Sequence, residues 1–320
     1  MPRSMLTIAI CTHNRSGDLA ECLQSLLGGR ARAMPPVLVV DSASSESERL
    51  KIAAAAAQWP HAGLIRVDRP GLATARNAAL AATRTDWIAY LDDDVVAADD
   101  WIGEALHAVR SAPPDCAIIG GRVDPIYADG QSCQIGPRWR QLLSLTQVES
   151  GEDLRGEAGI VGANVIFRRE ALLAVGAFSP QLGRVGKVLL SGEEKLVVEC
   201  LRKQGAAILH NGRMRVGHKI PRERLERSWA ARRAYWDGIS DQKIRRMQGE
   251  QVGPAALLKL LASLPVLGLA YFVPSPRQEF FLRFWYDVGY LRELFASVTL
   301  PTDAPAIAAE LTDRSASRAL

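Results

Sequence analysis

The sequence has few cysteines, no dense cluster of positive charge and no long uninterrupted apolar run. Its five cysteines are odd in number and scattered over 320 residues, and no two of them form a C-x-x-C pair. This scatter argues against a disulfide framework or a zinc site and favours reduced thiols in a cytosolic protein. The formal charge of +4 is mild, and no run of Lys or Arg predicts nucleic-acid binding. The opening MPRSMLTIAI contains no basic segment followed by a long apolar run, so we expect no signal peptide.

One C-terminal stretch, residues 252–273, has nearly the length needed to span a membrane. Lys259, Pro265 and Gly268 interrupt it, and each weakens a transmembrane interpretation. A buried helical lid and a helix lying in a membrane interface are the two favoured alternatives, the second because Trp and Arg residues are frequent nearby. The sequence leaves all three open.

The first hundred residues alternate between short apolar runs and segments with helical spacing of apolar residues. We expect strands at Leu6–Ile10, Val37–Val40, Gly63–Val67 and Trp87–Leu91, and helices at Leu19–Leu27, Leu50–Trp59, after Gly71 and near Trp101, where Asp99 or Asp100 can cap the helix. Strands that are apolar along their length, separated by helices, predict an α/β fold with a mostly parallel sheet covered on both faces.

The second half is less regular. Residues 124–159 show no clear pattern, GIVGANVIFRREALLAVGAF predicts a strand, a turn and a helix, and SGEEKLVVECLRKQG predicts a helix that Gly205 ends. A brief strand at Ala207–Leu209 follows, with His218 after it. The last hundred residues predict a helical extension with a loose tail.

Polar residues follow three of the predicted strands. They are Thr12–Arg15, Asp41–Ser45 and Asp92–Asp94. Ligands of parallel sheets bind at the carboxyl ends of the strands. We therefore expect one binding site built from these three segments.

The acidic run Asp92–Asp94 predicts a partner of positive charge. Carboxylate oxygens are hard ligands for Mg²⁺ or Mn²⁺, and such an ion keeps room for phosphate oxygens. A diphosphate bridged through a metal fits this pattern, and the plain alternative is an acidic turn that faces solvent.

Three functional classes use such a run. A haloacid-dehalogenase-like phosphatase would take Asp92 as nucleophile and Asp94 as acid and base, but three strand–helix units precede the motif here. A calcium loop of the EF-hand type is rejected, because Ala97 stands where its sharp turn needs glycine. The third class is a glycosyltransferase with a D-x-D motif.

Several segments, in order, resemble the inverting family 2 glycosyltransferases. They are TIAICTHNR, VLVVDSASSE, RPGLATARNAAL, WIAYLDDDVV, GANVIFRREALLAVGAF and LLSGEEKLVVECLRKQG, which cover about Leu6 to His218. Ala79 replaces the glycine that is usual in the third, and Glu-Glu replaces the commoner Glu-Asp in the last. The resemblance implies the GT-A fold and the transfer of a sugar from a nucleoside-diphosphate sugar to an acceptor hydroxyl.

The resemblance implies a nucleotide-binding role for the first two loops. In Thr12–Arg15, His13 would stack on the base, while Thr12 and Asn14 would bond the base or ribose. Asp41 would accept a hydrogen bond from the base. UDP is the first candidate nucleotide, with dTDP and GDP as alternatives.

The resemblance also implies how the diphosphate and the sugar are handled. Arg76 would neutralise phosphate charge, and Asp92 and Asp93 would contact the nucleotide. Mg²⁺ or Mn²⁺ would be held by a set of three residues, namely Asp93, Asp94 and His218. A carboxylate would remove the proton of the acceptor hydroxyl, and Glu194 is favoured over Glu193 for this role.

The expected organisation follows from the extent of the resemblance. Residues 1–225 would form the GT-A domain, with a nucleotide-sugar half at 1–123 and an acceptor half at 124–225, and 226–320 would form the helical extension. The acceptor could be a glycan, a lipid-linked sugar or a small molecule, and the protein would be cytoplasmic, either free or peripheral on the inner face of the membrane. A non-catalytic nucleotide-binding subunit remains an alternative.

Overall fold

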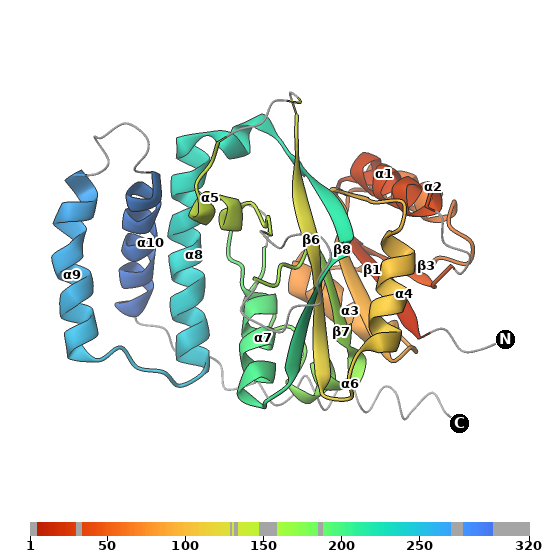
Figure 1. The fold of residues 1–320 in the computed structure, drawn as a ribbon. Coiled ribbons are helices and arrows are strands. Elements are labelled where there is room, and N and C mark those ends of the chain that lie inside the picture. The colour runs from red at the N-terminus through yellow and green to blue at the C-terminus, as the bar shows by residue number, and fades with distance from the viewer. Residues whose placement is uncertain are drawn as a thin grey trace.

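A single mixed sheet organises the molecule (Figure 1). The computed structural model describes residues 5–29, 34–128, 130, 134–146, 159–184, 188–269 and 278–296. The sheet has the order β3-β2-β1-β4-β7-β6-β8-β5. Its strands are β1 Leu6–Thr12, β2 Val37–Ser42, β3 Gly63–Val67, β4 Trp87–Asp92, β5 Val95–Ala97, β6 Cys116–Tyr127, β7 Asn164–Arg168 and β8 Ala207–Ile220. Only β5 and β7 among these described strands run against the others, so the predicted mostly parallel α/β sheet is confirmed.

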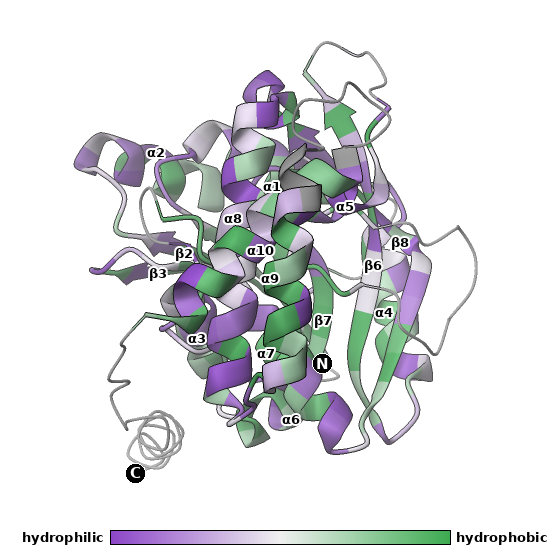
Figure 2. Cartoon of the chain, turned by 90° about the vertical axis from the view of Figure 1, so that its left-hand side faces the viewer, coloured by the Kyte–Doolittle hydropathy of each residue, from purple (hydrophilic) through white to green (hydrophobic). Residues whose placement is uncertain are grey.

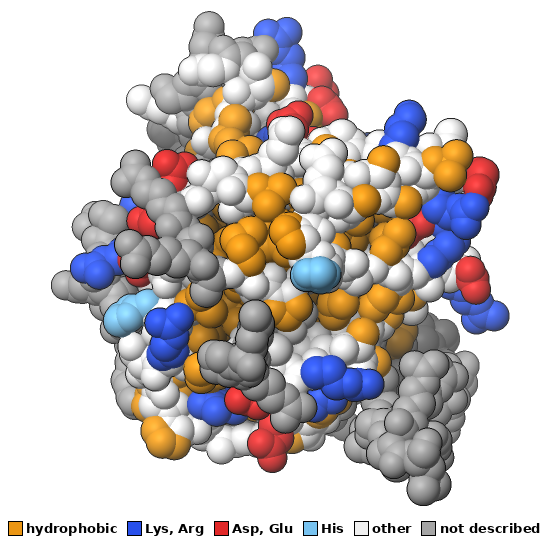
Figure 3. Space-filling view, turned by 90° about the vertical axis from the view of Figure 1, so that its right-hand side faces the viewer, with side chains coloured by type: hydrophobic (Ala, Val, Ile, Leu, Met, Phe, Trp, Pro, Cys, Tyr) orange, Lys and Arg blue, Asp and Glu red, His pale blue; other side chains and the backbone are white. Residues whose placement is uncertain are grey.

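Helices cover both faces of the sheet. They are α1 Ser16–Leu27, α2 Glu46–Ala56, α3 Leu72–Ala82, α4 Trp101–Ser111, α5 Pro137–Leu142, α6 Arg169–Ala174 and α7 Glu193–Lys203. Alternate residues of β1 divide between two cores: Leu6, Ile8 and Ile10 pack with α1, α2 and α4, and Ala9 packs with α3, α6 and α7. The side of the molecule near α1, α2 and α4 shows apolar side chains at its centre and charges of both signs around its rim (Figure 3).

The structure differs from the expected elements mainly between residues 95 and 220. β5 and β6 are strands that the sequence pattern did not predict, and the expected strand at Ala207–Leu209 extends to Ile220. The second part of β8 buries only alternate residues, so it contains no continuous apolar run to mark it. His218 therefore lies inside a strand rather than after one. Asp100 takes the capping position of α4 without a side-chain cap hydrogen bond, and residues 147–158 of the irregular region lie outside the described residues.

Three helices form a layer beside the sheet. They are α8 Arg227–Met247, α9 Pro254–Leu269 and α10 Gln278–Leu294, and the 3₁₀ helix η1, Arg222–Leu225, joins β8 to α8. Ile239 and Ile244 of α8 pack against Leu190 and Leu182, so α8 belongs to the folded core. The predicted helical extension is therefore confirmed.

The outermost helix, α9, exposes much of its apolar surface. Leu258 is 69% exposed and Leu261 is 43% exposed. Figure 2 shows α9 in front of α10, with mostly hydrophobic residues along it. Within the described ranges, no helix is long and apolar enough to cross a membrane. The end of the stretch considered for that role, residues 270–273, lies outside them.

Two glycines allow the main chains of α8 and α10 to come into direct contact. A Cβ atom on Gly289 would lie 1.9 Å from the carbonyl oxygen of Tyr235, and one on Gly238 would lie 2.0 Å from the carbonyl oxygen of Tyr286. Both contacts are with main-chain atoms, which a side-chain rotation cannot relieve. Glycine is therefore the residue that this crossing requires.

The substitution Gly289→Ala should destabilise the protein by about 1–3 kcal/mol, because the two helices must separate to admit a methyl group. Gly253→Ala is the matched control, since a Cβ there meets nothing within 4 Å. Urea unfolding followed by circular dichroism measures both. Equal midpoints for Gly289→Ala and the unchanged protein would show that the helices do not touch at this point.

Candidate active site

The strand register brings the three predicted loops together. Thr12 pairs with Asp41 across β1 and β2, and Cys11 pairs with Asp92 across β1 and β4. The strand order turns around at β1, with β2 on one side and β4 on the other. Such a switch point opens a crevice at the carboxyl ends of parallel strands. The convergence expected from the sequence is therefore present in the structure.

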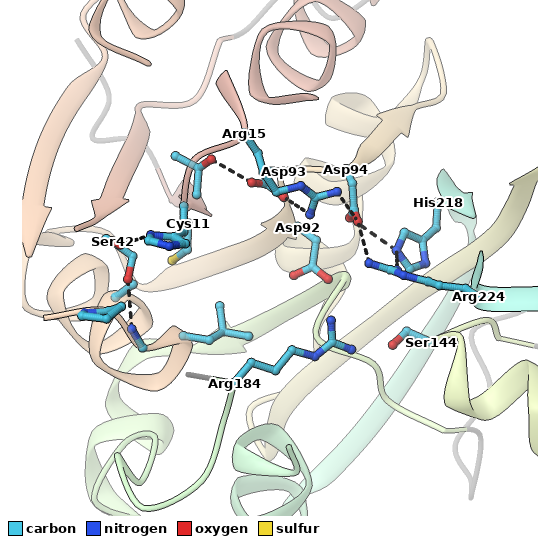
Figure 4. Close-up of a pocket in the computed structure, with 16 residues that line it drawn as sticks. Cys11, Arg15, Ser42, Asp92, Asp93, Asp94, Ser144, Arg184, His218 and Arg224 are labelled. Carbon is cyan, nitrogen blue, oxygen red and sulfur yellow. Dashed lines mark hydrogen bonds and ion pairs between the residues drawn. The ribbon is translucent and has the colours of Figure 1, made fainter. Parts of the chain in front are cut away.

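A cavity of about 310 Å³ occupies this crevice (Figure 4). Of the predicted site residues, Thr12, His13, Arg15, Asp92, Asp93, Asp94 and His218 line it, together with Cys11, Ser42, Pro70, Gly71, Leu72, Ala75, Ser144, Arg184 and Arg224. The remaining predicted residues, Asn14, Asp41, Arg76, Glu193 and Glu194, are not among its lining residues.

The acidic run has partners of positive charge within the protein itself. Arg15 donates hydrogen bonds to Asp93 Oδ1 at 2.9 Å and to Asp94 Oδ2 at 3.0 Å. Thr12 donates to the other oxygen of Asp93 at 2.7 Å. The Arg224 guanidinium lies 3.8 Å from Asp94. These contacts explain how adjacent carboxylates are tolerated in a folded chain.

The two buried aspartates have opposite protonation behaviour. Burial, and secondly the neighbouring negative charge of Asp94, raises the pKa of Asp93 to about 7 even though Arg15 opposes this. Burial also acts to raise the pKa of Asp94, but the hydrogen bond and charge of His218, with Arg15 and Arg224, hold it well below its usual range. The environment therefore keeps Asp94 ionised at neutral pH more firmly than Asp93.

His218 reaches the acidic run from β8. Its strand pairs with β5 so that His218 lies opposite Val95, one residue beyond Asp94. The ring nitrogen Nδ1 lies 3.0 Å from the carbonyl oxygen of Leu143, and Nε2 lies 3.3 Å from Asp94 Oδ1. The hydrogen bond to Asp94 requires a proton on Nε2. When Nδ1 alone carries the proton and donates to that carbonyl, Nε2 and Asp94 Oδ1 face each other as two acceptors, an arrangement that suits a cation between them.

No group of three or more His, Cys, Asp or Glu side chains in the described part of the chain is arranged to hold a metal ion. Asp94 and His218 are adjacent. Both oxygens of Asp93 accept hydrogen bonds from Thr12 and Arg15, and Asp94 Oδ2 accepts one from Arg15 as well. The metal set of Asp93, Asp94 and His218 stays a prediction.

The loops after β1 and β2 hold each other. His13 Nδ1 lies 2.6 Å from the carbonyl oxygen of Ser42, and the Asn14 backbone donates to Ser44 Oγ at 2.8 Å. Asn14 adopts φ +54°, a left-handed conformation that Asn tolerates better than most residues. Asp41 accepts hydrogen bonds from the Ser44 backbone and from Arg66. His13 therefore lines the cavity, while Asp41 stabilises the loop after β2 through these hydrogen bonds.

Arg76 is the centre of a buried charge cluster that joins α3 to α7. Its guanidinium donates to Glu193 at 2.9 Å and to Asp92 at 3.4 Å, and lies 3.7 Å from Glu194. The Arg76 and Glu193 side chains are only 4% and 2% exposed, whereas that of Glu194 is 23% exposed. Burial, then the charge of Glu194, raises the pKa of Glu193 to about 7 against the opposing charge of Arg76. Glu194 is thus the carboxylate of the pair with access to solvent.

Two arginines of the cavity were missed by the sequence analysis. Arg184 precedes α7 and Arg224 belongs to η1, and Figure 4 shows both side chains extending into the cavity near Asp92 and His218. Arg224 follows His218 by six residues in an arginine-rich segment, which was the available signal. The segment around Arg184 carries no comparable pattern.

Comparison with known proteins identifies the family of this chain. The model of the family described as Glycosyl transferase family 2 matches residues 7–176. The chain is 25% identical over 244 residues to a glucosyl-dolichyl phosphate glucuronosyltransferase of Haloferax volcanii, covering 73% of this chain and 75% of the relative. It is 27% identical over 248 residues to the succinoglycan biosynthesis protein ExoM of Rhizobium meliloti, covering 74% and 75%.

Solved structures share the fold. The mannosyltransferase PcManGT from Pyrobaculum calidifontis, in complex with GDP-Man and Mn²⁺, aligns with TM-score 0.61 and 18% identity, covering 92% of this chain and 88% of that one. Residues 1–349 of S. aureus TarS, in complex with UDP, align with TM-score 0.51 and 14% identity, covering 86% and 77%.

Proposed function

Because this chain belongs to glycosyl transferase family 2 and is a glycosyltransferase, we propose that it moves a sugar from a nucleoside-diphosphate sugar to an acceptor hydroxyl with inversion at the anomeric carbon. The observation that carries the proposal is the cavity at the switch point, where Asp92–Asp94 face Arg184, Arg224 and His218. This set can balance the charge of a diphosphate. We also propose that the glycosyltransferase domain ends at about residue 225 and that the helical region follows it.

We propose that the nucleotide lies along the ends of β1 and β2. His13 lines the cavity there, and its ring can stack on a base. Asp92, whose side chain is 31% exposed, is free to accept hydrogen bonds from ribose hydroxyls. UDP remains our first candidate; UDP is bound in the TarS structure and GDP-Man in the PcManGT structure, so GDP is the alternative to test beside it.

The residues present fit a divalent cation, although in a smaller set than expected. Asp94 Oδ1 and His218 Nε2 lie 3.3 Å apart, and neighbouring ligands of an octahedral ion bound at about 2.1 Å lie about 3 Å from each other. We propose that these two residues hold Mg²⁺ or Mn²⁺, with Asp93 close by. When bound, the ion would stabilise negative charge on the departing diphosphate.

The protein's own cations complete the leaving-group site. Arg184 and Arg224 line the cavity, so we assign them to the diphosphate, the role first given to Arg76. Arg76 is buried among carboxylates and bonded to Glu193, and we assign it to positioning α7. Preorganised cations favour the transition state because charge grows on the leaving group during bond cleavage.

Inversion requires a base on the side of the sugar opposite the leaving group. Glu194 is the second residue of α7, and its side chain is 23% exposed where that of Glu193 is 2% exposed. We propose that Glu194 removes the proton of the acceptor hydroxyl while that oxygen attacks the anomeric carbon. The acceptor belongs to glycan or glycoconjugate synthesis, as the names of the similar proteins suggest.

The metal proposal predicts different behaviour for two adjacent aspartates. Asp94→Asn should reduce the affinity for UDP in Mn²⁺ by about tenfold or more, since it removes one of two ligands. It should also lower stability, because Asp94 lies beside the guanidinium groups of Arg15 and Arg224 and accepts a hydrogen bond from Arg15. Asp93→Asn should leave more of the metal-dependent affinity and should raise stability above pH 7, where the native state otherwise holds a buried charge. Thermal shifts with UDP or GDP, with and without Mn²⁺, measure both effects.

The same assay decides the proposal as a whole. If every nucleotide binds equally well with and without Mn²⁺, and equally well to both variants, the metal assignment is wrong. Release of nucleoside diphosphate at one rate with and without any acceptor would contradict transfer to a hydroxyl.

A further inference from the structure

Arg15 provides an internal counter-ion for two residues of the acidic run. Its guanidinium donates to Asp93 Oδ1 at 2.9 Å and to Asp94 Oδ2 at 3.0 Å, and Figure 4 shows it directed at both carboxylates. The Arg15 side chain is 39% exposed, whereas Asp93 and Asp94 are buried. The arginine is therefore the accessible member of this group of three, and it is bonded to carboxylates beside the proposed metal site.

The contacts of Arg15 compete with a divalent cation for the same carboxylates. Asp94 Oδ1 faces His218 Nε2 at 3.3 Å, and the other oxygen of Asp94 accepts a hydrogen bond from Arg15. A divalent cation bound to Asp94 would lie close to a guanidinium, and like charges at short range repel each other. Arg15 also engages one oxygen of Asp93. Its release would remove this repulsion and free an oxygen of each aspartate.

Arg15 has further partners outside the acidic run, so it can leave the aspartates without losing every contact. Its Nε atom donates to Asp18 in the first turn of α1 at 3.1 Å, and Lys219 donates to the other oxygen of Asp18 at 2.8 Å. Arg15 also lines the catalytic cavity, where we place the diphosphate. A guanidinium can bond to phosphate with two parallel hydrogen bonds, as it does to carboxylates. The donor itself thus offers Arg15 a new partner.

From these contacts we infer that Arg15 is a switch that makes metal binding depend on the nucleotide. Without a diphosphate, Arg15 stays on Asp93 and Asp94 and weakens the affinity of the site for Mg²⁺ or Mn²⁺. With the diphosphate in the cavity, Arg15 turns to the phosphate oxygens and releases both aspartates. The inference rests on the proposed nucleotide and metal sites and adds how their occupancy is coupled. Because such coupling is reciprocal, the ion also strengthens nucleotide binding through Arg15.

Calorimetric titration of the full chain with Mn²⁺ alone tests the switch directly. Arg15→Met should bind Mn²⁺ about tenfold or more tightly than the unchanged protein, because the competing guanidinium is gone. Arg224→Met is the control for nearby charge. It also removes a cation beside Asp94, but one that lies 3.8 Å away, so its gain should be smaller. Arg84→Met changes an exposed arginine that does not line the cavity and should match the unchanged protein.

The same titration with UDP present measures the coupling. The ratio of the Mn²⁺ affinities with and without UDP should fall about tenfold or more in Arg15→Met. Binding of Mn²⁺ to UDP in solution is common to all variants, so the comparison between variants isolates the part due to Arg15. Arg15→Lys keeps a positive charge but loses the planar fork that bonds two carboxylates. Its Mn²⁺ affinity and its ratio should lie between those of Arg15→Met and the unchanged protein.

Urea midpoints identify the variants that fold, and Arg15→Lys alone decides if Arg15→Met does not. Equal Mn²⁺ affinity in the unchanged protein and in the folded Arg15 variants overturns the inference. An equal gain in Arg15→Met and Arg224→Met overturns it as well, because the effect then comes from the charge of the cavity rather than from the bonds of Arg15. UDP affinity that falls by one factor with and without Mn²⁺ would make Arg15 a phosphate ligand only.

The switch and the proposed metal site fail separately in these titrations. Mn²⁺ that binds the unchanged protein neither with nor without UDP contradicts the metal site, and the switch with it. Mn²⁺ that binds together with UDP, with the same ratio of affinities in Arg15→Met and the unchanged protein, leaves the metal site and the transferase standing and removes only the switch.

Discussion

Turnover should fall by about 100-fold or more in Glu194→Gln, while the affinity for the donor stays near that of the unchanged protein. Glutamine has nearly the shape of glutamate but cannot accept the proton of the acceptor hydroxyl. Glu194 is the more exposed member of the pair, and its Oε2 atom lies 3.7 Å from the Arg76 guanidinium without a hydrogen bond to it. Donor affinity should persist because Glu194 is not among the residues that line the cavity. Steady-state kinetics with a saturating donor, together with calorimetric donor binding, measures both quantities.

Glu193→Gln is the control, since it makes the same chemical change one residue earlier. It should reduce turnover less, because Glu193 is buried and bonded to Arg76. It should also change how stability depends on pH. The pKa of Glu193 is raised from 4.5 to about 7, so between these values the native state binds a proton that the unfolded state has lost. Stability from this group therefore falls as pH rises through that window, and Glu193→Gln should reduce the fall.

The kinetic comparison also identifies the other outcomes. Full turnover in Glu194→Gln with a 100-fold loss in Glu193→Gln would move the base by one residue. Full turnover in both variants would place the base elsewhere.

Arg76→Met should lower the free energy of unfolding by about 3–5 kcal/mol, because it leaves the buried carboxylate of Glu193 without its cation. Arg76 also donates to the carbonyl oxygen of Gly162 at 3.3 Å and lies 5.6 Å from the centre of the Phe178 ring. Methionine can replace the packing against Phe178 but not the hydrogen bond to Gly162. The loss should be larger at pH 8 than at pH 6, because at the lower pH Glu193 can take up a proton. Urea unfolding at the two pH values measures it.

The double variant Arg76→Met with Glu193→Gln provides the test of cause. If the unpaired carboxylate causes the loss, the double variant should be more stable than Arg76→Met alone, which gives a favourable coupling in the cycle. Strictly additive losses would show that Arg76 stabilises the fold through its packing instead.

The sequence predicted the first half of the sheet because its strands are buried on both faces. β1, β2 and β4 are continuous apolar runs that end in polar residues. Both the strand and its ligand-binding end can therefore be recognised in the sequence. β8 and the short β5 carry no such run, and their pairing brings His218 to Asp94 from 124 residues away. No local pattern encodes that contact. Arg184 was missed for the same reason, since its place in the cavity depends on a non-local contact in which its carbonyl oxygen accepts a hydrogen bond from Leu72 at the start of α3.

The different positions of Glu193 and Glu194 could not be predicted from the sequence without the structure. The sequence shows only that neighbouring residues of a helix point in different directions. Which one turns inward is decided by Arg76, whose buried guanidinium takes Glu193 as its partner. Glu194 is then the carboxylate of the pair that does not bond to Arg76.

The glycine crossing of α8 and α10 has a consequence for how relatives of this chain diverge. Gly238 and Gly289 form no part of the proposed catalytic cavity, but each faces the main chain of the opposite helix at a distance that excludes any larger residue. Purifying selection should therefore be strong at both positions for reasons unrelated to the sugar. A lineage that substitutes one of them must move α8 and α10 apart at this point, so a substitution there should accompany a change in helix packing rather than a change of substrate.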